Sequence, residues 1–324
     1  MIIFWSFLTL LLMLRSEKVG IDLSKYILIF KSMGVKSWGS AITRSAEFAN
    51  NFMLKTIYEL TADFRWVIVI SAILSVAFIS WAYVKYTSDA SLSIVLYINM
   101  TNFILLFSGL RQSIAISLGF LAFEFVRRKK LIPFILVVAL AMLFHTSAFM
   151  LAFMYPLYHV RITRKWLVGI IPVLLLLFLF NRPIFTFLGS ILEQFTKYDS
   201  SITLTGSYTM LILLILFAAF SFIIPDESLL DDDTIGMRNF LLLTVMLQMF
   251  APLHTIAMRM NYYYLAFIPL VIPRIIECRS VRWNQIAIIA RYVFIIYFCF
   301  YFFFTVYQKN DLMTFPYRFF WGAA

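Results

Sequence analysis

Long apolar segments recur along almost the whole chain, and they restrict the fold more than any other feature does. Many approach the roughly 20 residues with which a helix crosses a bilayer. Hydrophobic residues make up 63% of the 324 residues and charged residues only 13%, which is far from the composition of a soluble protein. Alternating strands of the barrel type are absent, so the spans should be helical. The sequence predicts an all-α, polytopic integral membrane protein with about 9–11 transmembrane helices.

The apolar segments predict a single transmembrane domain, residues 1–324, without a separate soluble domain or an internal repeat. Three stretches are too polar to span: an amphipathic extracytoplasmic segment at 15–62, an extracytoplasmic loop at 181–207 and an acidic cytoplasmic loop at 225–237. The run 131–160 is too long for one simple crossing, and His145 interrupts it. We predict two short helices that meet at His145. The predicted spans are 1–14, 65–86, 92–110, 113–126, 131–144, 147–160, 166–180, 208–224, 240–252, 262–276 and 284–307.

The net charge of +11 comes largely from short loops between spans. The basic loops 127–130, 161–165 and 274–282 fall on one side if 131–160 forms two helices, and the positive-inside rule makes that side cytoplasmic. The excess charge therefore does not indicate a nucleic-acid partner. The acidic loop is more typical of a solvated surface than of a metal site, and the two isolated cysteines, Cys278 and Cys299, are more typical of packing.

This threading collects the chemically active residues on the outer face. An ionisable residue at membrane depth is a functional hypothesis, because it is costly unless a cavity or a partner receives it. The alternative is that Arg111 and His145 snorkel or cap helix ends. Guanidinium groups bind phosphate oxygens in a bidentate fork, so converging arginines suit an anionic headgroup. Tyrosines fit either an aromatic belt or a sugar-stacking wall. The outer-face candidates are Arg15, Asp22, Tyr26, Arg111, His145, Arg182, Tyr198, His254, Arg259, Tyr262, Tyr263 and Tyr264.

Six short elements occur in a characteristic order. They are Leu14-Arg15 with Val19-Gly20-Ile21-Asp22 and Tyr26; Leu110-Arg111-Gln112-Ser113-Ile114-Ala115; Phe144-His145-Thr146-Ser147-Ala148; Phe195-Thr196-Lys197-Tyr198; Arg259-Met260-Asn261-Tyr262-Tyr263 with Ile268-Pro269; and Pro316-Tyr317. This series resembles the EpsG/Wzy-type polysaccharide polymerases over nearly the whole chain. Two departures are the single apolar segment 1–14 before the first element, where members have a further one, and Ile21 in place of a polar residue. We expect either an upstream start or a lost helix.

The resemblance implies a helical bundle like that of Wzy and the GT-C glycosyltransferases, in a bacterial inner (cytoplasmic) membrane. It implies metal-independent glycosyl transfer without a cofactor, between oligosaccharide repeat units on polyprenyl diphosphate, at the outer face. A chain-length regulator and a flippase are the partners it implies. We assign Arg111, Arg259 and Arg15 to the diphosphate, with Gln112, Tyr26, Tyr198, Tyr262 and Tyr263 around the substrate. His145 and Asp22 are the candidates for removing the proton, and an N-cap or ion-pair role for Asp22 and a helix-junction role for His145 stay open.

Three other functions stay open. A carrier or flippase would show matching halves with helices broken at the midplane, and no such halves are visible in the sequence. An O-antigen-ligase-like transferase would use the same arginine chemistry, so the sequence does not separate it from a polymerase. A glycan acyltransferase would take its donor from the cytoplasm, which disagrees with polar residues on the outer face.

Overall fold

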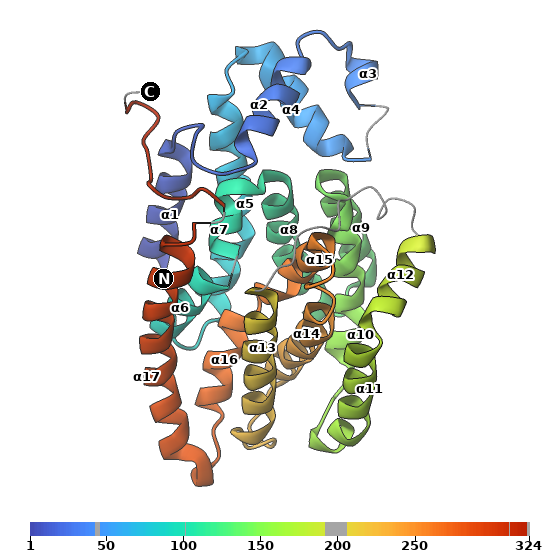
Figure 1. Cartoon of the computed structure of the whole chain (residues 1–324), viewed down its shortest axis with the longest axis vertical. Helices are drawn as coiled ribbons and strands as arrows, with labels where there is room; N and C mark the ends of the chain where they lie inside the picture. Colours follow the sequence, from blue (N-terminus) through green and yellow to red (C-terminus); the bar gives the residue numbers. More distant parts are fainter. Residues whose placement is uncertain (43–45, 101, 192–205, 311, 323–324) are drawn as a thin grey trace. The chain divides into compact units, whose positions relative to one another are not determined.

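The computed structural model describes residues 1–42, 46–100, 102–191, 206–310 and 312–322. Within these ranges the chain is helical and contains isolated bridges but no strand, so the predicted all-α class is confirmed (Figure 1). The fold divides into two compact units, the first formed by Met1–Ala152 with Val293–Ala324 and the second by Phe153–Tyr292. The predicted single transmembrane domain stays a prediction.

The first unit contains the N-terminal helices and the C-terminal tail. Its helices are α1 (Ile2–Leu14), α2 (Leu23–Ser32), α3 (Trp38–Ile42), α4 (Phe48–Thr61), α5 (Arg65–Tyr86), α6 (Ala90–Asn99), α7 (Asn102–Ser108), α8 (Leu110–Arg127), α9 (Leu131–Phe144), most of the 3₁₀-helix η1 (Thr146–Phe153), the end of α17 (Asn284–Tyr301) and the π-helix η5 (Phe302–Tyr307).

The second unit is also helical in the residues that the structure describes. Its helices are α10 (Met154–His159), the 3₁₀-helix η2 (Arg164–Trp166), α11 (Leu167–Leu179), α12 (Asn181–Ile191), α13 (Gly206–Ile223), α14 (Asp232–Gln248), α15 (Thr255–Leu265), α16 (Ile268–Glu277), the 3₁₀-helix η4 (Val281–Trp283) and the beginning of α17.

Several helices expose long apolar surfaces. In the described ranges two helices, Arg65–Tyr86 and Val281–Tyr307, are long and apolar enough to cross a membrane, and up to four spans result if each bent helix pair counts as one. Shorter apolar helices at Ile2–Leu14, Leu131–Phe144 and Ser207–Ile223 account for further predicted spans. Helix α11 buries none of its residues. Surfaces of this kind are stable in lipid and not in water, so the protein is membrane-embedded.

Most predicted boundaries agree with the observed helices, and some need correction. Helix α5 has the predicted bounds, and α9 ends at Phe144, so the predicted break at His145 is confirmed. The acidic loop is shorter than predicted, because Asp231 caps α14 through the Thr234 N–H and the helix begins at Asp232. Residues 181–191 of the predicted outer loop form α12. The predicted spans 92–110 and 262–276 are each two helices, α6 with α7 and α15 with α16.

Helix α8 is the central element of the first unit, and it packs against α5 and α9. Small polar residues are buried on both helices, Ser71 and Ser75 on α5 and Ser117 on α8. The Ser117 hydroxyl accepts a hydrogen bond from the Phe78 N–H at 3.2 Å. Small side chains allow helix backbones to approach closely in a membrane. A Cβ at Gly119 would lie 2.9 Å from Leu151 of η1, so α8 and η1 are in close contact. The middle of α8 is therefore packed closely against its neighbours.

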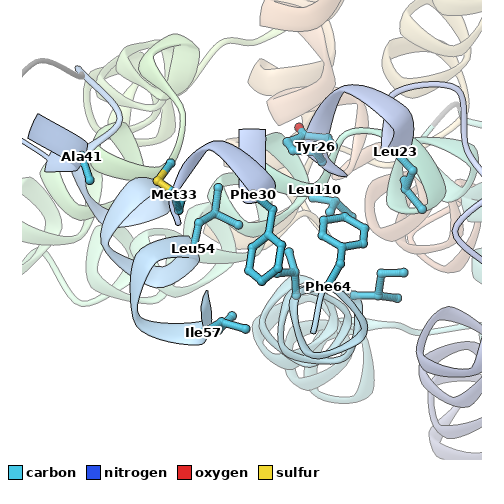
Figure 2. Close-up of a cluster of buried hydrophobic side chains, with 11 residues drawn as sticks. Leu23, Tyr26, Phe30, Met33, Ala41, Leu54, Ile57, Phe64 and Leu110 are labelled. Carbon is cyan, nitrogen blue, oxygen red and sulfur yellow. The ribbon is translucent and has the colours of Figure 1, made fainter. Parts of the chain in front are cut away.

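The segment between α1 and α5 forms a layer of three helices, α2, α3 and α4, over one end of the first unit (Figure 1). Figure 2 shows the apolar cluster beneath it, in which Phe30, Leu54 and Phe64 bring α2, α4 and the start of α5 together with Leu110 of α8. Tyr26 belongs to the same cluster. The segment predicted to be amphipathic, 15–62, thus contains three helices in its described residues. Because Tyr26 and Leu110 flank Arg111, the cluster also fixes the surroundings of that arginine.

The C-terminal tail lies along the segment that follows α1. Backbone hydrogen bonds join Ser16 to Arg318 at 2.7 Å and Gly20 to Met313 at 3.0 Å, and the Tyr317 hydroxyl donates to the Leu11 carbonyl at 2.7 Å. Gly20 has φ +117°, and a Cβ there would collide with the Phe107 carbonyl oxygen. Only glycine adopts this conformation without strain. The first and last sequence elements therefore meet in the structure.

Helix α14 is the core of the second unit and contacts α10, α13, α15 and α16. Its buried Arg238 donates to Glu227 at 2.8 Å and to the Ile162 carbonyl at 2.6 Å. The Asn261 amide on α15 donates to Gln248 on α14 at 2.9 Å. These hydrogen bonds connect α14 with α15 and with the segments on either side of α13, so they hold the elements of the unit together.

Candidate functional site

A buried carboxylate, Glu47, forms the centre of the polar cluster in the first unit. Glu47 precedes α4, and its side chain is 13% exposed. One carboxylate oxygen lies 2.7 Å from Nδ1 of His145, and the other pairs with the Arg111 guanidinium. The three residues are 64 and 98 positions apart in the chain. The structure thus brings together the two residues that the sequence singled out most strongly, and it adds a third.

The backbone geometry at the end of α9 directs His145 toward Glu47. His145 follows the last helical residue and is extended, with φ −151° and ψ 119°, before the 3₁₀-helix begins at Thr146. The Thr146 N–H also hydrogen-bonds to Glu47. A helix-junction role alone would need only local partners, whereas the imidazole reaches a carboxylate on another element. The contact therefore goes beyond a helix-junction hydrogen bond.

Arg111 lies at the beginning of α8 with its guanidinium between two partners. Its Nε donates to the Tyr26 hydroxyl at 3.3 Å, and the guanidinium carbon lies 5.3 Å from the centroid of the Tyr26 ring. The Arg111 side chain is 31% exposed and the His145 side chain 15% exposed. The ion pair and the ring fix the orientation of the guanidinium, while its partial exposure leaves it within reach of a ligand.

The surroundings keep Glu47 ionised. Burial alone would raise the pKa of this carboxyl, but the hydrogen bond with His145 and the charge of Arg111 outweigh burial and lower its pKa below the ordinary value. Because Nδ1 of His145 lies against the Glu47 carboxylate, Nε2 is the ring nitrogen that remains for another partner. The cluster therefore contains an imidazole that can accept a proton, at His145, and a guanidinium that can bind an anion, at Arg111.

Asp22 lies at the beginning of α2, one turn before Tyr26. Its carboxylate accepts a hydrogen bond from the Ser108 hydroxyl at 3.0 Å and lies 3.8 Å from the Lys25 ammonium. Its side chain makes no capping hydrogen bond to α2. Of the two structural roles considered for Asp22, the ion pair is therefore present and the cap is not. Ser108 ends α7 just before Arg111, so Asp22 lies beside the same helix junction as Arg111.

Arg15 is buried beneath the residues of the C-terminal tail. Its side chain is 1% exposed, donates to the Leu106 carbonyl at 3.1 Å and lies over the Phe107 ring. Burial lowers the pKa of Arg15 to about 9, which leaves the group charged at neutral pH. In this conformation Arg15 supports the turn between α1 and α2 and presents no surface to a ligand. Gln112, next to Arg111 on α8, is also buried.

The remaining candidate residues lie in the second unit or outside the described residues. Arg259, Tyr262 and Tyr263 are on α15, and both tyrosines are buried in the helix packing. His254 caps the same helix, since its Nδ1 accepts a hydrogen bond from the Ile256 N–H at 3.1 Å. Tyr198 lies outside the described residues. The structure thus brings Arg111, His145 and Tyr26 together, with Asp22 on the next turn of α2 from Tyr26.

Sequence reasoning missed Glu47. It lies in a segment where Lys18, Lys25, Lys31 and Lys36 are more conspicuous. One signal was present, because Arg111 and His145, placed in apolar surroundings, each require a partner. A systematic search for carboxylates on the same predicted face would have included Glu47, but sequence spacing does not show which one pairs with them.

The described residues contain no group of three or more His, Cys, Asp or Glu side chains that could hold a metal ion. Comparison with known proteins gives one positive result, since the model of the EpsG family matches residues 1–319. No curated protein and no solved structure matches the chain. Because the family match extends over nearly all of the sequence, the protein belongs to the EpsG family.

Proposed function

We propose that the protein polymerises oligosaccharide repeat units that are carried on polyprenyl diphosphate. Membership of the EpsG family supports a polysaccharide polymerase-type role in general. One observation supports the more specific proposal that the protein transfers repeat units from polyprenyl diphosphate. The carboxylate of Glu47 binds both Arg111 and His145. We place the reaction at the outer face of a bacterial cytoplasmic membrane, because the basic loops favour the opposite face as cytoplasmic.

His145 acts in this proposal as the general base. With Nδ1 held by Glu47 at 2.7 Å, Nε2 is available to accept the proton of an acceptor sugar hydroxyl. The carboxylate fixes the tautomer and stabilises the imidazolium that forms. Such a base contributes about 10²–10⁴-fold to the rate of a reaction. Glu47 is then a positioning residue, and His145 contacts the reacting hydroxyl.

Arg111 binds the diphosphate in this proposal. Negative charge develops on the leaving diphosphate oxygen as the glycosidic bond to it breaks, and a fixed guanidinium stabilises that charge. Arg111 is already oriented by Glu47 and Tyr26, so it needs little rearrangement. Glu47 keeps the guanidinium near the base, which sets the distance between the two substrates.

The bonds and protons balance in a single displacement. The acceptor oxygen forms a bond with the anomeric carbon of the donor, and the bond from that carbon to the diphosphate oxygen breaks. The bonding electron pair leaves with polyprenyl diphosphate, and the acceptor proton moves to Nε2 of His145. Water later removes that proton from the imidazolium.

Complementation of a deletion strain tests the proposal. Arg111→Ala and His145→Ala should each accumulate single repeat units on lipid, while the amount of protein in the membrane stays at the wild-type level. Lys31→Ala is the matched control, because Lys31 is an exposed cation on α2 and contacts none of the three residues. The measurement is the glycan length distribution on a gel, together with an immunoblot of the membrane fraction.

The alternative functions give different products. Long polymer in both variants would contradict the assigned site. Polymer of normal length that lacks a substituent such as acetyl in the deletion strain would indicate an acyltransferase. Full-length polymer that stays on polyprenyl diphosphate would indicate a ligase, and absence of repeat units from the outer face would indicate a transporter.

A further inference from the structure

A second polar cluster lies at the other end of α8 from Arg111. Its centre is Glu124, whose side chain is 7% exposed and pairs with three cations. Lys85 of α5 lies 3.0 Å from each carboxylate oxygen, and Arg128 donates to the same carboxylate through Nε at 2.7 Å. Arg127 lies 3.2 Å from it and also donates to the Tyr86 hydroxyl at 2.6 Å. We call Lys85, Glu124, Arg127 and Arg128 the Glu124 cluster.

The charges of this cluster do not balance. Three cations and one carboxylate leave a formal charge of +2, and Lys129 and Lys130 follow directly in the chain. Lys129 has φ +54°, and the Lys130 N–H bonds back to the Phe125 carbonyl at 2.9 Å, so the chain turns tightly and keeps these cations at the helix end. The cluster therefore attracts anions. Its carboxylate orients the three cations and competes with any anion that binds them.

Exposed apolar side chains lie beside the cations on both neighbouring helices. On α5, the Lys85 ammonium lies 4.8 Å from the centroid of the Trp81 ring, and Trp81 and Val84 are exposed. On α9, Ile132 is 72% exposed and Ile135 is also exposed. A phosphate group alone would gain nothing from such a surface, whereas a phospholipid can place its headgroup on the cations and its acyl chains along the helices.

We propose that the Glu124 cluster binds the headgroup of an anionic phospholipid, with the acyl chains along the exposed faces of α5 and α9. Charge complementarity and the adjoining apolar surface favour this occupant over a soluble anion. The site is independent of glycosyl transfer, because it lies at the opposite end of α8 from Glu47, Arg111 and His145. Anionic lipids attract basic groups at the membrane surface with an energy that is worth about fivefold in affinity for each Lys or Arg.

Trp81 provides a direct reporter of binding. Phosphatidylglycerol with brominated acyl chains should quench the fluorescence of the purified protein at lower lipid concentration than brominated phosphatidylcholine does. Trp81→Phe should remove the part of the quenching that depends on the headgroup. Lys85→Gln combined with Arg128→Gln should weaken the phosphatidylglycerol effect by about 25-fold, if each cation contributes about fivefold. Lys31→Gln, an exposed cation on α2, should leave it unchanged.

Glu124→Gln should change the affinity for phosphatidylglycerol in the direction opposite to that of the Lys85→Gln and Arg128→Gln variant. Removing the competing carboxylate should tighten phosphatidylglycerol binding, even where the melting temperature of the variant falls, whereas a merely structural cluster predicts no gain in binding. Equal quenching by the two lipids in the wild type would overturn the proposal. Displacement of the lipid by millimolar inorganic phosphate would indicate a site for a soluble anion and would also overturn it.

Discussion

Glu47 is ionised, mostly buried and bound to two side chains of different chemistry. A carboxylate in this position can hold a cation, orient an imidazole, or do both, and substitutions separate these roles. Glutamine keeps the size of Glu47 and removes its charge, so it leaves Arg111 without a counter-ion and no longer stabilises an imidazolium at His145. Aspartate keeps the charge but shortens the side chain by one methylene group.

We predict that Glu47→Gln lowers the rate of polymer formation by about 100-fold or more, because both proposed functions of the carboxylate are lost. Glu47→Asp should retain more activity than Glu47→Gln but less than the wild type. The measurement is polymer formed per unit time by membranes that are supplied with lipid-linked repeat units. Glu17→Gln, which changes an exposed carboxylate of the same segment, should behave as the wild type. Equal rates for wild type and Glu47→Gln would contradict the role of Glu47.

The lowered pKa of Glu47 also predicts how stability depends on pH. The folded protein holds this carboxyl below its ordinary pKa of 4.5, so folding favours the ionised form. The resulting stabilisation is fully present above the unfolded pKa and is lost as the pH falls through the folded pKa. The stability advantage of wild type over Glu47→Gln, measured as a difference in melting temperature, should therefore narrow as the pH falls below about 4.5. A difference that does not narrow in this range would contradict the lowered pKa of Glu47.

At the scale of elements, sequence periodicity predicts a helix and its bounds well where they depend only on the composition of that segment. The bounds of α5 and the break at His145 follow from local composition. The boundaries that differ depend on capping and on local breaks, as when Asp231 caps α14 and moves its start into the acidic run. The pairing of Glu47 with residues of α8 and α9 depends on how α2, α3 and α4 pack over the bundle end, which no local pattern contains.

Substitution of Gly20 tests whether the turn after α1 supports the packing of the α2–α4 layer. Gly20→Ala requires a left-handed φ of +117° and places a Cβ against the Phe107 carbonyl, so we expect a cost of about 1–3 kcal/mol. The strain should also displace Asp22, two residues later, and lower polymer formation. Thermal unfolding of the purified protein gives the stability difference.

The matched control is Gly39→Ala on α3. A Cβ at Gly39 would meet no atom within 4 Å, and alanine is the better helix former by about 0.8–1.0 kcal/mol. Gly39→Ala should therefore be neutral or stabilising in the same assay. A similar loss of stability in both variants would show that the conformation at Gly20 is not the cause.

At the scale of the whole molecule, the two polar clusters lie near opposite ends of α8. Arg111 and Glu124 are 13 residues apart on this helix, which corresponds to about 20 Å at 1.5 Å per residue, against about 30 Å for the hydrocarbon core of a membrane. Arg111 lies near its first residue and Glu124 near its last turn. We propose that the candidate catalytic cluster and the lipid cluster face opposite membrane surfaces, and that the first is extracytoplasmic because the second contains the basic residues.

Single-cysteine labelling tests this orientation. In a background where Cys278 and Cys299 are replaced by serine, Lys31→Cys on the α2–α4 layer should react with a membrane-impermeant maleimide in intact spheroplasts. Lys129→Cys, at the basic end of α8, should react only after the membrane is permeabilised. Both residues are exposed, so full labelling in detergent provides the reference for each. Labelling of Lys129→Cys in intact spheroplasts, with Lys31→Cys protected, would place the Glu47 cluster in the cytoplasm and would exclude polymerisation at the outer face, because the proposed catalytic residues could not then meet substrates there.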